Sequence, residues 1–208
     1  LRLFVTIERR TAAPLVMLHW FRTRNFAFPM LSQMLTNFAY MGGFILIPQV
    51  LGQRGLGLSD ATKGYLVISR PLAFSLIAPL AALATMRVGE RVAGVVGALG
   101  VVLSMVLWAT VGLDSSYAFI VLATACSGIG LGIASPALTS LMANAVAEAD
   151  LGVAGAMQQL MTQLGAVMGS AVLATVSVTA TPTNLAPFHL AFVVGAVVGV
   201  RPGTGPVP

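Results

Sequence analysis

One arginine stands inside an apolar segment of this sequence. Arg70 lies near the middle of GYLVISRPLAFSLIAPL, residues 64–80, which is otherwise apolar enough to lie in lipid. The guanidinium keeps its proton, and an arginine at the centre of a spanning helix costs about 2.5 to 3.5 kcal/mol on insertion scales. Two placements remain open. Arg70 either reaches the outer interface, with Ser69 or carbonyls freed by Pro71 as partners, or it lines a cavity and binds an anionic group of a substrate or a carboxylate from another segment.

Two further sets of polar side chains recur at helical spacing inside apolar segments. One combines an i, i+4, i+7 polar stripe with methionines beside it, and the other is rich in glutamine. Polar residues inside spans usually face the bundle interior or a watery cavity, although each could instead form an interhelical hydrogen bond worth about 0.6 kcal/mol. With Arg70, these stripes predict a substrate-binding cavity lined by Gln33, Asn37, Tyr40, Arg70, Gln159 and Gln163.

Other kinds of chemistry lack their residues in this sequence. Cys126 is the single cysteine, and His19 and His189 stand alone without a neighbouring carboxylate, so neither a disulfide nor a metal site is predicted. We find no nucleotide-binding loop and no nucleophile elbow. The net charge of +5 comes from basic residues in short gaps between apolar blocks, which does not indicate nucleic acid. We therefore predict no enzyme activity and no cofactor.

The composition is that of a protein that crosses a membrane several times. Hydrophobic residues make up 57% of the chain and charged residues 8%, against about 25% charged in soluble domains. The mean hydropathy is +0.93. A spanning helix needs about 20 apolar residues. This rule predicts an all-α bundle of about six helices, at 27–50, 62–84, 92–113, 117–142, 152–178 and from about 187 onward.

The two ends of the chain differ from the helical part. Residues 1–24 are interpreted as the end of a preceding helix and a basic linker, 25–200 as the transmembrane domain, and 201–208 as a disordered tail. The last helix would rise only about 21 Å before RPGTGPVP forbids helix. Since the sequence also begins with Leu1 rather than methionine, we expect a fragment with a truncated last helix.

The basic residues predict an orientation. If the helices alternate, most lysines and arginines fall on one side, which the positive-inside rule assigns to the cytoplasm together with both ends of the chain. The third and sixth predicted helices carry few polar residues, so we expect them to face lipid. Two lined helices followed by a peripheral one, repeated, predict a pair of three-helix repeats, as in many secondary transporters.

Three stretches resemble the C-terminal half of a Major Facilitator Superfamily transporter, specifically the fourteen-helix drug/proton antiporter branch. They are MRVGERVAGVVG at 86–97, GIGLGIASPALTSLM at 128–142 and DLGVAGAMQQLMTQLGAVMGSAV at 150–172. The resemblance implies a gating role for the cytoplasmic loop residues Arg87, Gly89 and Arg91. Met86 replaces the usual aspartate of that loop, and Thr162 stands where many relatives have arginine, so these two charge roles are not carried over.

The resemblance implies part of a secondary active transporter for proton-coupled efflux of amphipathic small molecules or drugs. Its partners would be an N-terminal half absent from this chain, a small-molecule substrate, protons and the lipid bilayer, and its place a bacterial cytoplasmic membrane. A non-transporting membrane scaffold or sensor, or a fragment inactive by itself, are the alternatives. Neither the substrate nor the oligomeric state follows from the sequence.

Overall fold

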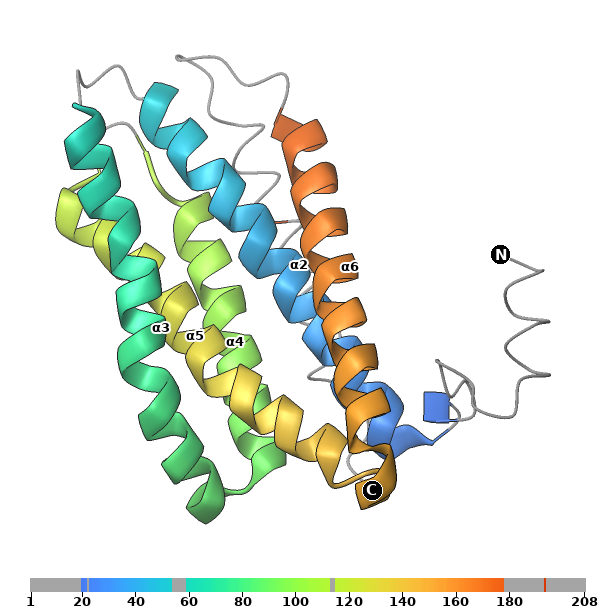
Figure 1. The fold of residues 1–208 in the computed structure, drawn as a ribbon. Helices are drawn as coiled ribbons and strands as arrows, with labels where there is room; N and C mark the ends of the chain where they lie inside the picture. The colour runs from blue at the N-terminus through green and yellow to red at the C-terminus, as the bar shows by residue number, and fades with distance from the viewer. Residues whose placement is uncertain (1–19, 22, 54–58, 113–114, 178–192, 194–208) are drawn as a thin grey trace.

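The computed structural model of the chain is a bundle of long α-helices (Figure 1). It describes residues 20–21, 23–53, 59–112, 115–177 and 193. The helices are α2 (Arg24–Gln53), α3 (Asp60–Val88), α4 (Glu90–Ala109), α5 (Tyr117–Ala143) and α6 (Leu151–Ser177), with a 3-10 turn at Glu148–Asp150 before α6. The all-α prediction is confirmed, and a helix lies at each of the first five predicted places, although α6 is not among the helices that qualify as candidate membrane spans. The predicted sixth helix and both predicted terminal segments lie outside or almost entirely outside the described residues.

Helices α2 to α5 are long and apolar enough to cross a membrane, judged by length and composition. Serines cap two of them, because a serine hydroxyl oxygen can accept hydrogen bonds from the free backbone N–H groups of a first turn. Ser59 accepts from the Thr62 backbone N–H at 3.2 Å and Ser116 from that of Phe119 at 3.3 Å. Successive helices alternate in direction (Figure 1). As a result, the α3–α4 turn and the α5–α6 connection lie at the same end of the bundle as the start of α2.

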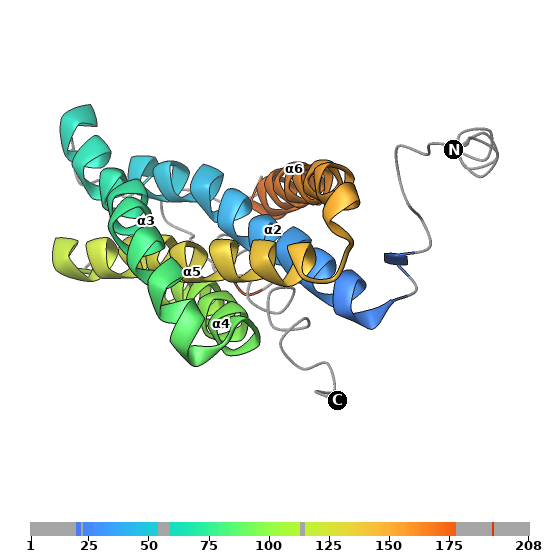
Figure 2. The same cartoon turned by 60° about the horizontal axis from the view of Figure 1, so that its bottom comes forward.

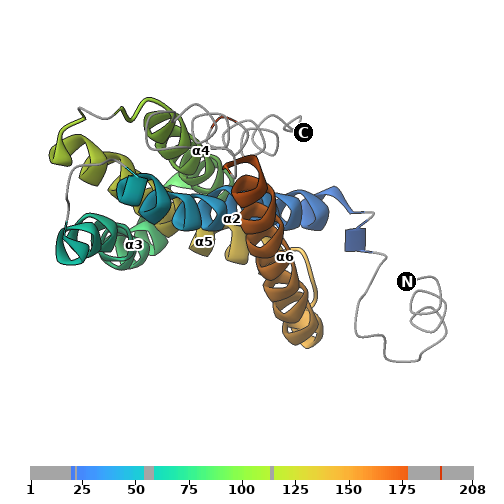
Figure 3. The same ribbon diagram turned by 90° about the horizontal axis from the view of Figure 1, so that it is seen from above.

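Helix α5 is the centre of the packing. It lies along both α3 and α4, whereas α6 packs on α2 and touches α5 only lightly. Figures 2 and 3 show α6 beside α2, on the side away from α3 and α4. The larger core cluster joins α2, α4 and α5 around side chains such as Leu46, Met105 and Trp108.

Glycines bring the helix backbones into direct contact, as the small-residue pattern predicts. A Cβ atom on Gly97 would meet backbone atoms of α5, and one on Gly130 would lie 2.5 Å from the Val101 nitrogen of α4. On the other side of the bundle, Gly165 and Gly169 lie against backbone carbonyls of α2. These contacts fix which face of each helix points inward.

Two helices leave broad apolar faces uncovered. Helix α3 exposes large hydrophobic side chains along its length, among them Tyr65, Leu72, Leu76, Leu80 and Leu83, and α6 exposes Leu160, Leu164, Val167 and Met168. Such continuous apolar faces are rare on soluble monomers and mark surfaces covered by lipid or by another protein segment. Helix α4 also exposes a row of valines and leucines. Its expected contact with lipid stays a prediction.

Candidate functional site

Arg70 lies in the interior of the bundle. Its side chain has no exposed surface, and its Nη2 donates a hydrogen bond to the backbone carbonyl of Tyr40 on α2. The neighbouring Ser69 donates to the Leu66 carbonyl at 2.8 Å instead of to Arg70. Of the two placements left open by the sequence, the guanidinium therefore takes the inward one, and its partner belongs to a different helix.

Two aromatic rings of α2 surround the guanidinium. Its central carbon lies 3.6 Å from the centre of the Tyr40 ring and 5.5 Å from that of Phe44. A cation over an aromatic face is stabilised by about 2 kcal/mol or more when it is removed from water. Even so, the Arg70 Nε and Nη1 atoms find no hydrogen-bond partner among the described residues. The site thus holds a cation with unused donors.

The polar stripe of α2 continues from Tyr40 toward the start of the helix. Gln33 and Asn37 are each 4% exposed. The Gln33 Nε2 atom lies 3.4 Å from the Thr162 hydroxyl of α6, and the Asn37 amide donates to the Gln33 carbonyl at 2.9 Å. Among the described residues, the Gln33 Oε1 and Thr36 Oγ1 atoms have no hydrogen-bond partner. This part of α2 therefore presents polar atoms whose bonding is incomplete.

The two glutamines predicted on α6 lie apart from this stripe. Gln159 and Gln163 are both exposed, and their side chains make no hydrogen bond within the part of the chain that the structure describes. The residues of α6 that do reach neighbouring helices are Thr162, bonded to Gln33, and Gln158, whose Nε2 donates to the Thr139 hydroxyl at 2.6 Å. The structure therefore places Arg70 on Tyr40, with Asn37 and Gln33 about one and two turns farther along α2, and leaves Gln159 and Gln163 on an open face.

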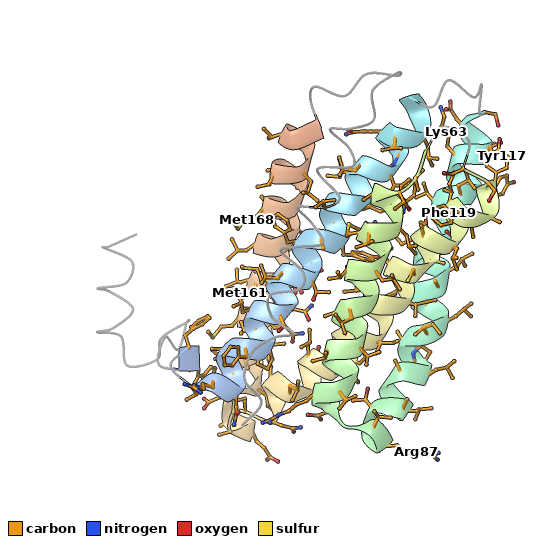
Figure 4. The ribbon with its side chains drawn as sticks, turned by 180° about the vertical axis from the view of Figure 1, so that it is seen from behind. Lys63, Arg87, Tyr117, Phe119, Met161 and Met168 are labelled. Carbon is orange, nitrogen blue, oxygen red and sulfur yellow. The ribbon has the colours of Figure 1, made fainter. Side chains whose placement is uncertain are left out.

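A single glycine joins α3 to α4. Gly89 has φ 95° and ψ 141°, a conformation that glycine adopts without strain, and its N–H donates to the Thr85 carbonyl at 2.9 Å. The flanking Arg87 and Arg91 are exposed and form no ion pair with any described residue. Figure 4 shows Arg87 at one end of α3 and Lys63 at the other. The gating role of Arg87, Gly89 and Arg91 stays a prediction.

A carboxylate beside this turn forms a link that the sequence analysis did not identify. Glu90 accepts hydrogen bonds from the Ser140 hydroxyl and from the Asn144 amide, the latter at 2.9 and 3.1 Å to its two oxygens. The start of α4 is thereby tied to the end of α5. The one signal in the sequence is an acidic residue at the first position of a helix, where it also suits the helix dipole.

Replacing Glu90 by alanine is expected to lower the thermal midpoint of the purified protein. The change removes the carboxylate that accepts hydrogen bonds from Ser140 and Asn144. Hydrogen bonds to a charged group contribute about 1.5 to 3 kcal/mol to stability. Because this link is partly exposed, we expect the loss of stability to lie near the lower value. Glu148→Ala is the matched control, because Glu148 is an exposed acidic residue at the same end of the bundle. Equal midpoints for the two variants would show that the link carries no stability.

No group of three or more metal-ligating side chains occurs among the residues described by the structure. Cys126 is half-buried in α5, with its thiol 3.7 Å from the Gly100 carbonyl of α4. It packs between helices α4 and α5. Among the described residues, the buried polar side chains are therefore one arginine, amides and hydroxyls inside the helix bundle.

Comparison with known proteins agrees with this architecture. The chain is 26% identical over 174 residues to "Multidrug resistance protein Stp" of Mycobacterium tuberculosis, covering 84% of this chain and 32% of that protein. It is 21% identical over 173 residues to "Multidrug transporter protein MdtP" of Bacillus subtilis, covering 83% and 32%. The chain thus spans about a third of the length of these curated relatives. Residues 29–201 match the Major Facilitator Superfamily, and on that match the chain is a member of this superfamily of transporters.

Proposed function

We propose that the chain forms the C-terminal half of a proton-coupled exporter of amphipathic small molecules, in the fourteen-helix branch of the superfamily. The observation that carries the proposal is the buried Arg70 with unused donors beside the incompletely bonded polar stripe of α2. Polar groups inside a membrane domain are costly and commonly belong to substrate or ion pathways. The names of the two relatives, a multidrug resistance protein and a multidrug transporter, favour drugs as substrates.

In this proposal Arg70, which has no exposed surface in the structure, contacts an anionic group when α2 and α3 move apart during transport; that group is either on the substrate or a carboxylate of the N-terminal half. Tyr40 and Phe44 hold the guanidinium in place, while Gln33 and Asn37 offer amides to polar groups of the substrate. Gln159 and Gln163 face the open side of α6 and would bind the part of the substrate that lies farther from α2. Met34 and Met41 of α2, which are not buried, supply adaptable apolar contacts, which suit a site that accepts varied shapes.

The uncovered faces support the proposed partners and location. The apolar faces of α3 and α6 need a cover, which the N-terminal half and lipid would provide. At one end of the bundle the described arginines Arg24, Arg87 and Arg91 are exposed, while Lys63 at the other end is paired with Asp60 at 3.0 Å. By the positive-inside rule the arginine end lies in the cytoplasm of a bacterial cell, with the protein in its cytoplasmic membrane.

Asn37→Ala and Gln159→Ala in the full-length transporter are expected to change which compounds are exported. Both variants remove an amide from the proposed cavity, which alters the affinity for substrates that bond to it by about tenfold, the equivalent of one hydrogen bond of about 1.4 kcal/mol. Ser104→Ala is the control. The Ser104 hydroxyl of α4 donates to the Ala123 carbonyl of α5 at 2.6 Å, so it lies between these two helices and outside the proposed cavity. The measurement is a resistance profile over a panel of amphipathic drugs, combined with uptake into proteoliposomes under an imposed pH gradient.

Two results would contradict the proposal. If all three variants and the wild type give the same resistance profile, the proposed substrate cavity lined by α2 and α6 is wrong. If the full-length protein is folded in the liposomes but transports nothing under a pH gradient, the proposal of proton-coupled efflux is wrong.

A further inference from the structure

An apolar groove lies between α3 and α4 at the end of the bundle that carries Arg87 and Arg91. Its volume is about 300 Å³, and it is lined almost only by carbon atoms. The lining side chains come from α3, α4 and one turn of α5: Ile77, Leu80, Ala81, Ala84, Thr85, Val88, Val92, Ala93, Val96 and Ile133. The Thr85 hydroxyl is already bonded to the Ala81 carbonyl at 2.7 Å, so it offers no donor to an occupant.

The groove has the length of one leaflet of a bilayer. From Ile77 to Val88, α3 rises about 16 Å, which is about half of the roughly 30 Å hydrocarbon core. Several of the lining residues, including Leu80, Val88, Val92 and Val96, are half or more exposed. The groove therefore opens outward and can receive an extended apolar chain from the side.

Two exposed arginines adjoin the groove lining in the sequence. Arg87 precedes the lining residue Val88, and Arg91 precedes Val92. Figure 4 shows Arg87 at the end of α3. The start of α4 has no side-chain cap on its free N–H groups, which favours phosphate, although its first residue is the acidic Glu90.

The carboxylate of Glu90, at the start of α4, is turned toward α5. Glu90 lies between the two arginines in sequence, but its carboxylate accepts from Ser140 and Asn144 of α5. No ion pair of Arg87 or Arg91 is found among the described residues. The Glu90 carboxylate keeps its negative charge, so two arginines and one carboxylate leave one net positive charge at this end of the groove.

We propose that this groove binds an anionic phospholipid, with one acyl chain between α3 and α4 and the phosphate on Arg87, Arg91 and the start of α4. The apolar lining, the single-leaflet length and the two adjoining arginines match the three parts of such a lipid. Basic sites between membrane helices commonly bind anionic headgroups. The lipid would fix the spacing of α3 and α4 around the Gly89 joint.

The test uses the full-length transporter and native mass spectrometry with phosphatidylglycerol or phosphatidylcholine of identical acyl chains. Wild-type protein is expected to retain phosphatidylglycerol in preference. The double variant R87Q/R91Q should lose roughly 25-fold in affinity for it, because each basic side chain near an anionic lipid contributes about fivefold. Arg24→Gln, an exposed arginine at the same end of the bundle, is the control and should bind as the wild type does.

A second variant tests the groove without changing any charge. Ala84→Phe places a ring in the groove and should reduce retention of the lipid, whereas Ala82→Phe, on an exposed position of α3 outside the groove lining, should not. A photoreactive residue at position 84 should give adducts with phospholipid. The proposal is overturned if R87Q/R91Q or Ala84→Phe retains the lipid as its control does. Adducts with another protein segment at position 84 would equally overturn it, since the groove would then be covered by protein.

Discussion

Replacing Arg70 by alanine in the full-length transporter is expected to lower drug efflux by at least about tenfold, which corresponds to the loss of one charge-assisted hydrogen bond of about 1.5 to 3 kcal/mol. The alanine removes the only described side chain that joins α3 to the Tyr40 carbonyl, and with it the two unused donors. Arg70→Lys keeps the charge but loses the planar fork and its stacking on Tyr40. Its efflux should therefore lie between those of the alanine variant and the wild type.

The measurement is efflux of a fluorescent amphipathic dye from cells that lack their own exporters, with membrane abundance checked by immunoblot. Arg70→Met is a useful companion, because it fills most of the volume without the charge and so separates packing from electrostatics. If Arg70→Ala exports as fast as the wild type at equal abundance, the arginine has no part in transport. If the Arg70→Met variant exports as fast as the wild type, Arg70 contributes to transport only by filling space between the helices.

Replacing Gly130 by leucine is expected to prevent the bundle from folding, and Gly130→Ala should lower its thermal stability by about 1 to 3 kcal/mol, the usual cost of overpacking. A Cβ atom at this position would lie 2.5 Å from the Val101 nitrogen and 2.8 Å from the Gly97 carbonyl, both backbone atoms that cannot rotate away. The two helices would have to separate along their whole crossing.

Gly155→Ala is the matched control, because a Cβ atom there meets nothing within 4 Å and alanine is the better helix former. Thermal unfolding in detergent, followed by size-exclusion chromatography of the heated samples, gives the comparison. A Gly130→Ala protein that melts together with Gly155→Ala would mean that α4 and α5 cross at a larger distance than the structure describes.

Much of the fold follows from local properties of the sequence. Apolar length predicted the five helices. Ser59 and Ser116 cap two of their starts, a local signal that the sequence analysis did not use. The bounds differ from the expected ones by only a few residues, as in 62–84 for a helix that covers Asp60–Val88. Such features depend on short stretches of chain and can be read from it.

The partners of the polar residues were harder to predict, because they depend on how helices pack. The sequence placed Arg70 and Tyr40 in the same cavity but did not pair them, since the contact joins residues 30 apart on helices that otherwise touch little. The predicted polar stripe of α6 consists of Gln158, Gln159, Thr162 and Gln163, and the sequence analysis did not establish which of these residues face α2. The glycines would have shown it: Gly165 and Gly169 share a helix face with Thr162, and Gln159 and Gln163 lie around the helix from that face.

The glycine contacts of α5 also have a mechanical consequence. At Gly128 and Gly130 the backbone of α5 touches the backbones of α3 and α4, with no side chain between them. A displacement at such a contact has no rotamer to absorb it, so it passes undamped from one helix to the next. Through these two glycines α3 and α4 are both held against the backbone of α5, so we expect the three helices to shift together. Helix α2 also packs on α4 and α5 in the larger core cluster, so a force on Arg70 from the α2 side would be shared among all four helices.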